Sequence, residues 1–158
     1  MKIKVAGILH ETTADMPGLA TSIFAQGCKH HCKNCHNPQT WDFNGGKDYT
    51  IEELFDIVVS DEFCDVVFSG GDPMFQVEAF AELAKMIKNR TNKAIWCYSG
   101  YTYEEIKNNA SMSVILPFLD ALVDGRYIDS QRNTNLRFRG SENQRIIHLK
   151  GGEIDWIE

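Results

Sequence analysis

Several features that would place this chain in a common protein class are missing. It has no run of about 20 apolar residues, the length that a membrane-spanning helix needs. The longest apolar run, residues 114–119, contains Pro117 and is followed by Asp120. A nucleophile elbow, a phosphate-binding P-loop and a dinucleotide-binding fingerprint are absent, as are internal repeats. These absences exclude a helical membrane protein and several large enzyme classes.

Positive charge is also in short supply, with 16 Lys and Arg residues against 22 Asp and Glu residues and a net charge of −6. Composition therefore forces no basic face, which weighs against nucleic acid as a partner. The first nine residues are too few and too charged for a secretory signal. We expect a cytoplasmic protein whose cysteines are reduced, and an odd count of five cysteines agrees with this.

Three of those cysteines, Cys28, Cys32 and Cys35, lie in one stretch with the spacing C-x3-C-x2-C. Thiolates that converge in this way indicate a metal ion or an iron–sulfur cluster. One interpretation is a structural zinc site whose fourth ligand is His30, His31 or His36. The other is a [4Fe–4S] cluster with three protein ligands, which leaves one iron free to bind a substrate or cofactor. The remaining two, Cys64 and Cys97, lie in apolar runs typical of a buried core.

Strand-like and helix-like segments alternate from about residue 20 to residue 125, a pattern that favours parallel β-α-β units. The expected strands are residues 3–9, 21–25, 65–69, 94–98, 119–123 and, as the last strand, 145–149. Capping boxes at Thr50–Glu53 and Thr102–Glu105 mark the starts of two helices. The first of these helices places Leu54, Phe55, Val58 and Val59 on one apolar face. Residues 75–88 form another expected helix.

A complete eight-unit barrel needs more than about 200 residues. We therefore expect an α/β fold, a partial (incomplete) TIM-type βα barrel, that forms a single domain over residues 1–158. Functional sites in such folds lie at the carboxyl ends of the parallel strands. The cysteine loop and the turn Gly70-Gly71-Asp72-Pro73 each follow an expected strand, so both should lie on that edge. Glycines there let a backbone approach a small ligand closely.

A third unusual segment, residues 137–145, carries Arg137, Arg139 and Arg145 among amides and a hydroxyl. Any one of these arginines is adequately explained as part of a solvated loop. Together, in an otherwise acidic chain, they are suited to contact a carboxylate, a phosphate or an acidic partner surface.

Taken together, these stretches resemble the radical S-adenosylmethionine superfamily. The likeness is strongest to its glycyl-radical activases, the activating proteins of anaerobic ribonucleoside-triphosphate reductases. It rests on the cysteine loop with Trp41, the Gly-Gly-Asp-Pro turn, and residues 22–28, 96–102, 123–127 and 139–145. Matching segments are thus spread over nearly the whole chain.

The resemblance implies that Cys28, Cys32 and Cys35 hold a [4Fe–4S] cluster whose fourth iron binds S-adenosylmethionine. It implies cofactor contacts from Asn34, Cys35, His36, Gly70, Gly71 and Asp72. The reduced cluster would cleave S-adenosylmethionine to methionine and a 5′-deoxyadenosyl radical, which would abstract hydrogen from a glycine of the partner reductase. Electrons would come from a donor such as a flavodoxin-type reductant.

The chain departs from the family pattern at one turn. Members usually have Asp-Gly-Pro-Gly, a branched residue and arginine there, whereas this chain has Met16 for the glycine and Ala20 for the arginine. Two alternatives stay open at this point. One is another radical S-adenosylmethionine enzyme, acting on a different glycyl-radical enzyme or a small molecule. The other, from a different class, is a zinc-stabilised interaction domain without catalytic activity.

Overall fold

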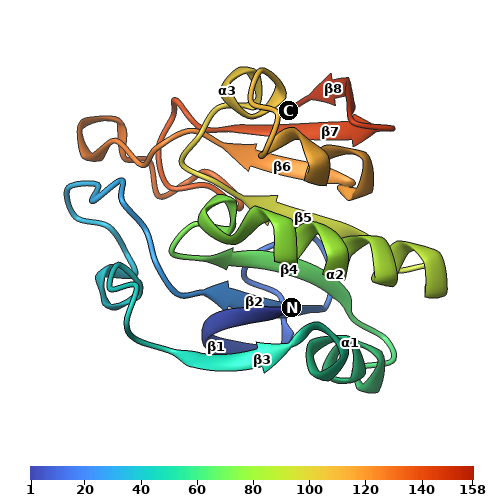
Figure 1. Ribbon diagram of the computed structural model, residues 1–158. Helices are drawn as coiled ribbons and strands as arrows, with labels where there is room; N and C mark the ends of the chain where they lie inside the picture. The colour runs from blue at the N-terminus through green and yellow to red at the C-terminus, as the bar shows by residue number, and fades with distance from the viewer.

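One eight-stranded mixed sheet forms the framework of the structure, a computed structural model that describes residues 1–158 (Figure 1). Its strand order is β3-β1-β2-β4-β5-β6-β7-β8. The strands are β1 (Lys2–Thr12), β2 (Ala20–Ala25), β3 (Lys47–Thr50), β4 (Asp65–Gly70), β5 (Ile95–Tyr98), β6 (Ala121–Asp124), β7 (Arg145–Lys150) and β8 (Glu153–Ile157).

Two of the three α-helices start where the capping boxes predict. The α-helices are α1 (Ile51–Ser60), α2 (Val77–Arg90) and α3 (Tyr103–Lys107), with 3-10 helices η1 (Pro38–Thr40), η2 (Pro73–Gln76), η3 (Ser113–Phe118) and η4 (Asp129–Gln131). Complete capping boxes open α1 at Thr50 and α3 at Thr102. In each, a threonine oxygen and a glutamate carboxylate accept the free amides of the first turn. No helix has the length and apolarity that crossing a membrane requires.

The four central strands, β2, β4, β5 and β6, are parallel, which confirms the expected β-α-β units. Their register aligns Ala25 of β2 with Gly70 of β4 at the carboxyl ends. The cysteine loop leaves from the first strand and the Gly-Gly-Asp-Pro turn from the second, so both lie on the predicted edge. Antiparallel strands flank this core, β1 and β3 on one side and β7 and β8 on the other.

Two apolar clusters cover the two faces of the sheet. The larger one lies under the helices, with Phe68 of β4 packed against Phe80 of α2 (Figure 1). The smaller one includes Val67 and Trp96, whose side chains alternate with those of the larger cluster along the strands. No helix contributes to this second cluster. Irregular segments around Met16 and Phe138 cover it instead.

The structure corrects several details of the sequence predictions. Residues 47–50 form β3, which was not expected, and β8 follows the strand that was expected to be last. Helix α2 begins at Val77 because residues 73–76 form η2. On α1, Leu54 and Val58 are fully buried as predicted, but Val59 is 39% exposed. The short polar β3 carries no periodicity of its own and exists because β1 pairs with it.

Candidate functional site

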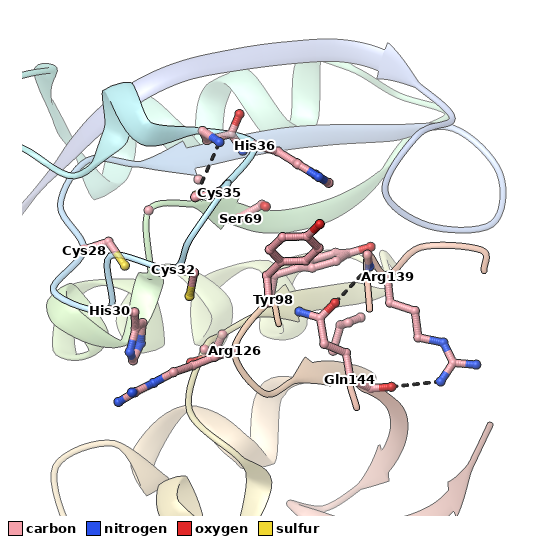
Figure 2. A pocket seen from close by; sticks show the side chains of 18 of the residues that line it. Cys28, His30, Cys32, Cys35, His36, Ser69, Tyr98, Arg126, Arg139 and Gln144 are labelled. Atoms are coloured by element: carbon pink, nitrogen blue, oxygen red, sulfur yellow. Dashed lines mark hydrogen bonds between the residues drawn. The ribbon is translucent and has the colours of Figure 1, made fainter. Parts of the chain in front are cut away.

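A cavity of about 300 Å³ lies at the carboxyl edge of the parallel strands and contains all three cysteines of the loop. This volume is at the lower end of the range for small-molecule sites, about 300 to 1,000 Å³. Figure 2 shows Cys28, Cys32 and Cys35 on one side of Tyr98 and Arg139 on the other, with Arg126 extending close to His30 and Cys32. The cavity therefore brings together segments from the first and last thirds of the chain.

The cysteine loop achieves its tight path with two residues in the left-handed backbone region, His31 at φ 50° and Asn34 at φ 58°. Histidine and asparagine are among the residues that adopt this region most readily. The amide of Cys35 donates to the Cys32 carbonyl at 3.1 Å, and Pro38 then opens η1. This compact winding places the three thiols on the same side of the loop.

The path of the cysteine loop leaves no room for a side chain at Gly70 or Gly71. A Cβ on Gly70, whose φ is 101°, would lie 2.3 Å from the Ala25 nitrogen, and one on Gly71 would lie 2.4 Å from the Gly27 oxygen. The Gly71 amide donates to Ala25 at 2.8 Å, and the Asp72 amide donates to Gly27 at 3.0 Å. The start of the cysteine loop is thus fastened directly to the turn after β4, and both glycines line the cavity.

Four of the six predicted cofactor-binding residues line the cavity, namely Cys35, His36, Gly70 and Gly71. The other two do not. Asn34 is exposed and donates to Asp129 at 3.0 Å. Asp72 is 1% exposed and lies behind the cavity wall, where its carboxylate accepts hydrogen bonds from within the protein.

The three histidines near the thiols contact other residues of the protein. These contacts matter because the zinc interpretation needs one of the histidines as the fourth ligand. His30 is hydrogen-bonded to Asp72, His31 stacks on Trp41 at 4.4 Å, and His36 lies 5.0 Å from Tyr127 between ring centroids. No group of three or more His, Cys, Asp or Glu side chains is arranged to hold a metal ion.

Burial favours the neutral thiol at Cys28 and Cys32. It raises the pKa of Cys28 to about 11. Burial also raises the pKa of Cys32, although the Tyr127 backbone amide and the positive charge of Arg126 act in the opposite direction. Because thiolates are the metal-binding form, binding of a metal centre here releases protons.

Positive charge dominates the wall that faces the thiols. Arg126 and Arg139 line the cavity and form no ion pair, and Asp15 is the one carboxylate in the lining. Arg139 donates from Nη1 to the Gln144 carbonyl at 2.8 Å, while its buried Nε has no partner. Such a wall suits an anionic group or a negatively charged cluster.

The arginines of the tail segment separate into different roles. Arg139 reaches the cavity, whereas Arg137 is exposed and lies over the Phe138 ring. Arg145 is engaged with Asp124 and Glu104 and holds strands together instead. Sequence reasoning did not single out Arg126, although it lies in the segment 123–127 that carried part of the resemblance. Asp124-Gly125 marks a turn after β6 in the sequence, but where that turn directs Arg126 depends on the packing of the sheet edge.

Comparison with known families gives the class of protein to which this fold and cavity belong. Residues 14–147 match the protein family described as "4Fe-4S single cluster domain". That match covers the cysteine loop, the glycine turn and the arginine-bearing wall, so it includes every segment that lines the cavity.

Relatives whose sequences align with most of this chain identify its family more closely. The anaerobic ribonucleoside-triphosphate reductase-activating protein of Vibrio cholerae is 37% identical over 141 residues, 84% of this chain and 88% of the relative. The proteins of the same name from Escherichia coli K12 and from Enterobacteria phage T4 are 31% and 32% identical, over 85% and 82% of this chain and 91% and 84% of the relatives. This chain belongs to the family of anaerobic ribonucleoside-triphosphate reductase-activating proteins.

Proposed function

We propose that this chain is a radical S-adenosylmethionine activase that generates the glycyl radical of an anaerobic ribonucleoside-triphosphate reductase. One observation carries the proposal: three cysteines of a single loop line the same cavity as a side-chain-free glycine turn and two unpaired arginines. The names of the relatives support the choice of partner protein.

The donor set fits a [4Fe–4S] cluster better than zinc, since three cysteines of one loop line the cavity and His30, a histidine between two of them, is hydrogen-bonded to Asp72. Cys28, Cys32 and Cys35 would hold the cluster. When bound, the cluster supplies the electron that cleaves the sulfonium of S-adenosylmethionine, and the resulting 5′-deoxyadenosyl radical takes a hydrogen atom from a glycine of the reductase.

The chain's own residues would bind and orient the reactants. Gly70 and Gly71 leave the cavity floor open to the amino acid part of S-adenosylmethionine, and His36 flanks it. Arg126 and Arg139 place positive charge opposite the thiols, where a cluster with its three thiolates adds negative charge. Direct contacts of Asn34 and Asp72 with the cofactor stay predictions of the resemblance, because neither residue lines the cavity.

The same proposal includes the architecture and the partners. A single domain with the curvature of a partial βα barrel would present the open edge of the cavity to the glycine-bearing segment of the reductase. A flavodoxin-type protein would supply the electrons. The acidic balance of the chain gives no reason to expect nucleic acid as a further partner.

The deciding experiment is anaerobic. The purified chain is analysed for iron, sulfide and zinc, its cluster is reduced, and electron paramagnetic resonance spectra are recorded with and without S-adenosylmethionine. We expect about four irons per chain and a spectrum that changes when S-adenosylmethionine is added. Incubation with the anaerobic reductase should then produce a glycyl radical signal.

A matched pair of variants assigns the cluster to the loop. Cys32→Ala should lose the cluster, whereas Cys64→Ala should retain it, because Cys64 is 3% exposed in the core and outside the cavity. Stoichiometric zinc, or a spectrum indifferent to S-adenosylmethionine, would reject the proposal. A responsive cluster without a glycyl radical on this reductase would instead indicate an activase for another glycyl-radical enzyme.

A further inference from the structure

The cysteine loop is tied to the glycine turn by a buried side-chain pair that the proposed chemistry does not use. Nε2 of His30 lies 2.7 Å from Oδ2 of Asp72, across 42 residues of sequence. Both side chains are almost wholly buried, at 5% and 0% exposure. His30 lies between Cys28 and Cys32, so this contact holds the middle of the segment that carries two of the proposed cluster ligands.

The Asp72 carboxylate accepts four hydrogen bonds from within the protein. Its Oδ2 accepts from His30, from the Ser99 hydroxyl at 2.9 Å and from the Gly100 amide at 2.9 Å. Its Oδ1 accepts from the Met74 amide at 2.9 Å. Two carboxylate oxygens offer about four acceptor sites. Because the Asp72 side chain is also fully buried, a direct contact with a bound cofactor would require the residues around it to move.

The surroundings of His30 fix the orientation of its ring. The ring centroid lies 5.5 Å from that of Phe75 and 4.7 Å from that of Tyr101, the latter in an edge-on arrangement. A Cβ on Gly100 would lie 2.6 Å from Cδ2 of His30, so the absence of a side chain there makes room for the imidazole. Because a carboxylate only accepts hydrogen bonds, Nε2 of His30 carries the proton in this contact.

We infer that His30 and Asp72 are positioning residues. Their contact fixes the distance between the cysteine loop and the turn at Gly70 and Gly71, so that a cluster bound to the loop lies next to S-adenosylmethionine. The inference rests on the proposed function and adds to it. Asp72 then acts on the site through His30 and the backbone amides, without touching the cofactor. His30 acts through the loop and is not a ligand.

The test removes the hydrogen bond while keeping the ring. His30→Phe retains the packing against Phe75 and Tyr101, and His30→Gln retains an amide donor that can reach Asp72. His31→Asn is the matched control, since the neighbouring His31 has no contact with Asp72 and asparagine tolerates its left-handed backbone. Thermal unfolding of each metal-free variant first verifies that it is folded.

The main readouts are iron content, the dissociation constant of S-adenosylmethionine for the reduced protein, and the change it causes in the electron paramagnetic resonance spectrum. At matched iron content we expect His30→Phe to bind S-adenosylmethionine at least tenfold more weakly and to lose most of the spectral change. His30→Gln and His31→Asn should stay within about threefold of the wild type. This rescue by glutamine identifies the hydrogen bond as the cause.

The possible negative results separate the positioning role of His30 from the proposed function of the chain. A His30→Phe variant with wild-type affinity and spectra would overturn the positioning role while leaving the proposed function intact. Loss of metal in both His30→Phe and His30→Gln would also overturn it, because it would identify His30 as a metal ligand. A wild-type cluster that ignores S-adenosylmethionine would overturn the proposed function, and the inference with it.

Discussion

The Arg145 guanidinium makes two hydrogen bonds to the Asp124 carboxylate, from Nε to Oδ1 at 3.0 Å and from Nη2 to Oδ2 at 2.5 Å. The two residues are paired across β6 and β7, and Asp124 is 1% exposed. Oδ2 of Asp124 also accepts the first amide of α3, from Tyr103, at 2.7 Å. The contact therefore joins two strands and a helix directly behind the cavity wall.

Arg145→Met should lower the free energy of unfolding by about 3 kcal/mol, because it leaves a buried carboxylate without its counter-charge. Denaturant unfolding of the metal-free protein measures this. Arg137→Met is the control, since Arg137 is exposed and forms no ion pair, and it should change stability by less than about 0.5 kcal/mol. Similar losses in both variants would contradict a specific role for the Arg145–Asp124 pair.

Met16 and Ala20, the two departures from the family turn, are explained by the second apolar cluster. Met16 is 4% exposed and Ala20 is fully buried, and both pack with Trp96 and Val67. Met16→Gly should cost about 2 to 5 kcal/mol through lost packing. Ala20→Arg should prevent stable folding, because the guanidinium would enter this cluster without a counter-charge. Thermal unfolding is the measurement.

The neighbouring Leu19 provides the control for that pair of variants. Leu19 is 41% exposed, so Leu19→Arg should leave the unfolding temperature nearly unchanged. A stable, fully folded Ala20→Arg protein would show that the turn can rearrange to admit the arginine that other family members carry.

Tyr98 links two segments from opposite ends of the chain at the cavity mouth. Its hydroxyl lies 2.7 Å from the carbonyl oxygens of both Asp15 and Phe138. Burial raises the pKa of Tyr98, so the hydroxyl stays a neutral donor. Tyr98→Phe should cost about 1 kcal/mol and accelerate proteolytic cleavage within residues 133–144.

Tyr101→Phe is the matched control for Tyr98→Phe, because the Tyr101 hydroxyl makes no hydrogen bond in the structure and the ring next to His30 is kept. Limited proteolysis followed by mass spectrometry locates the cleavage sites. Equal cleavage rates in the two variants would show that the Tyr98 hydroxyl does not hold the tail segment.

The hydrogen bonds of Asp61 predict how the stability of the folded protein depends on pH in the acid range. Oδ2 of Asp61 lies 2.6 Å from the Thr21 hydroxyl and 2.6 Å from Nδ1 of His10. Burial raises the pKa of Asp61, but the hydrogen bonds from Thr21 and His10 outweigh burial and bring the pKa below its ordinary value of 3.8. A depressed folded-state pKa adds stability above the unfolded-state value of about 3.9. That contribution is lost as the pH falls through the folded-state pKa.

Asp61→Asn should therefore be less stable than the wild type at pH 6, and the difference should shrink as the pH falls below about 4. Denaturant unfolding at several pH values checks the trend. Asp56→Asn, at an exposed position on α1, the helix that precedes Asp61, should follow the wild type throughout. A stability difference for Asp61→Asn that is the same at pH 3 and pH 6 would rule out this linkage.

Local sequence determined much of the fold and of the candidate site. Both capping boxes start the predicted helices, because cap and box residues interact within one turn of chain. The alternation of strands and helices predicted the parallel core, and the order of segments placed the cysteine loop and the glycine turn on one edge. The cysteine spacing predicted a shared site for the three thiols, and all three cysteines line one cavity.

Only the tertiary structure decided the features that depend on distant partners. Strand β3 has no periodicity that marks it, and it exists because β1 offers backbone groups to pair with. Strand β8 alternates Ile154 and Trp156 with acidic residues, but so short a segment becomes a strand only because β7 pairs with it. The contact of His30 with Asp72 spans 42 residues, and Arg126 reaches the cavity through a turn after β6. Local patterns report on interactions within a few residues. Contacts across the sheet edge arise only when packing brings separate strands together.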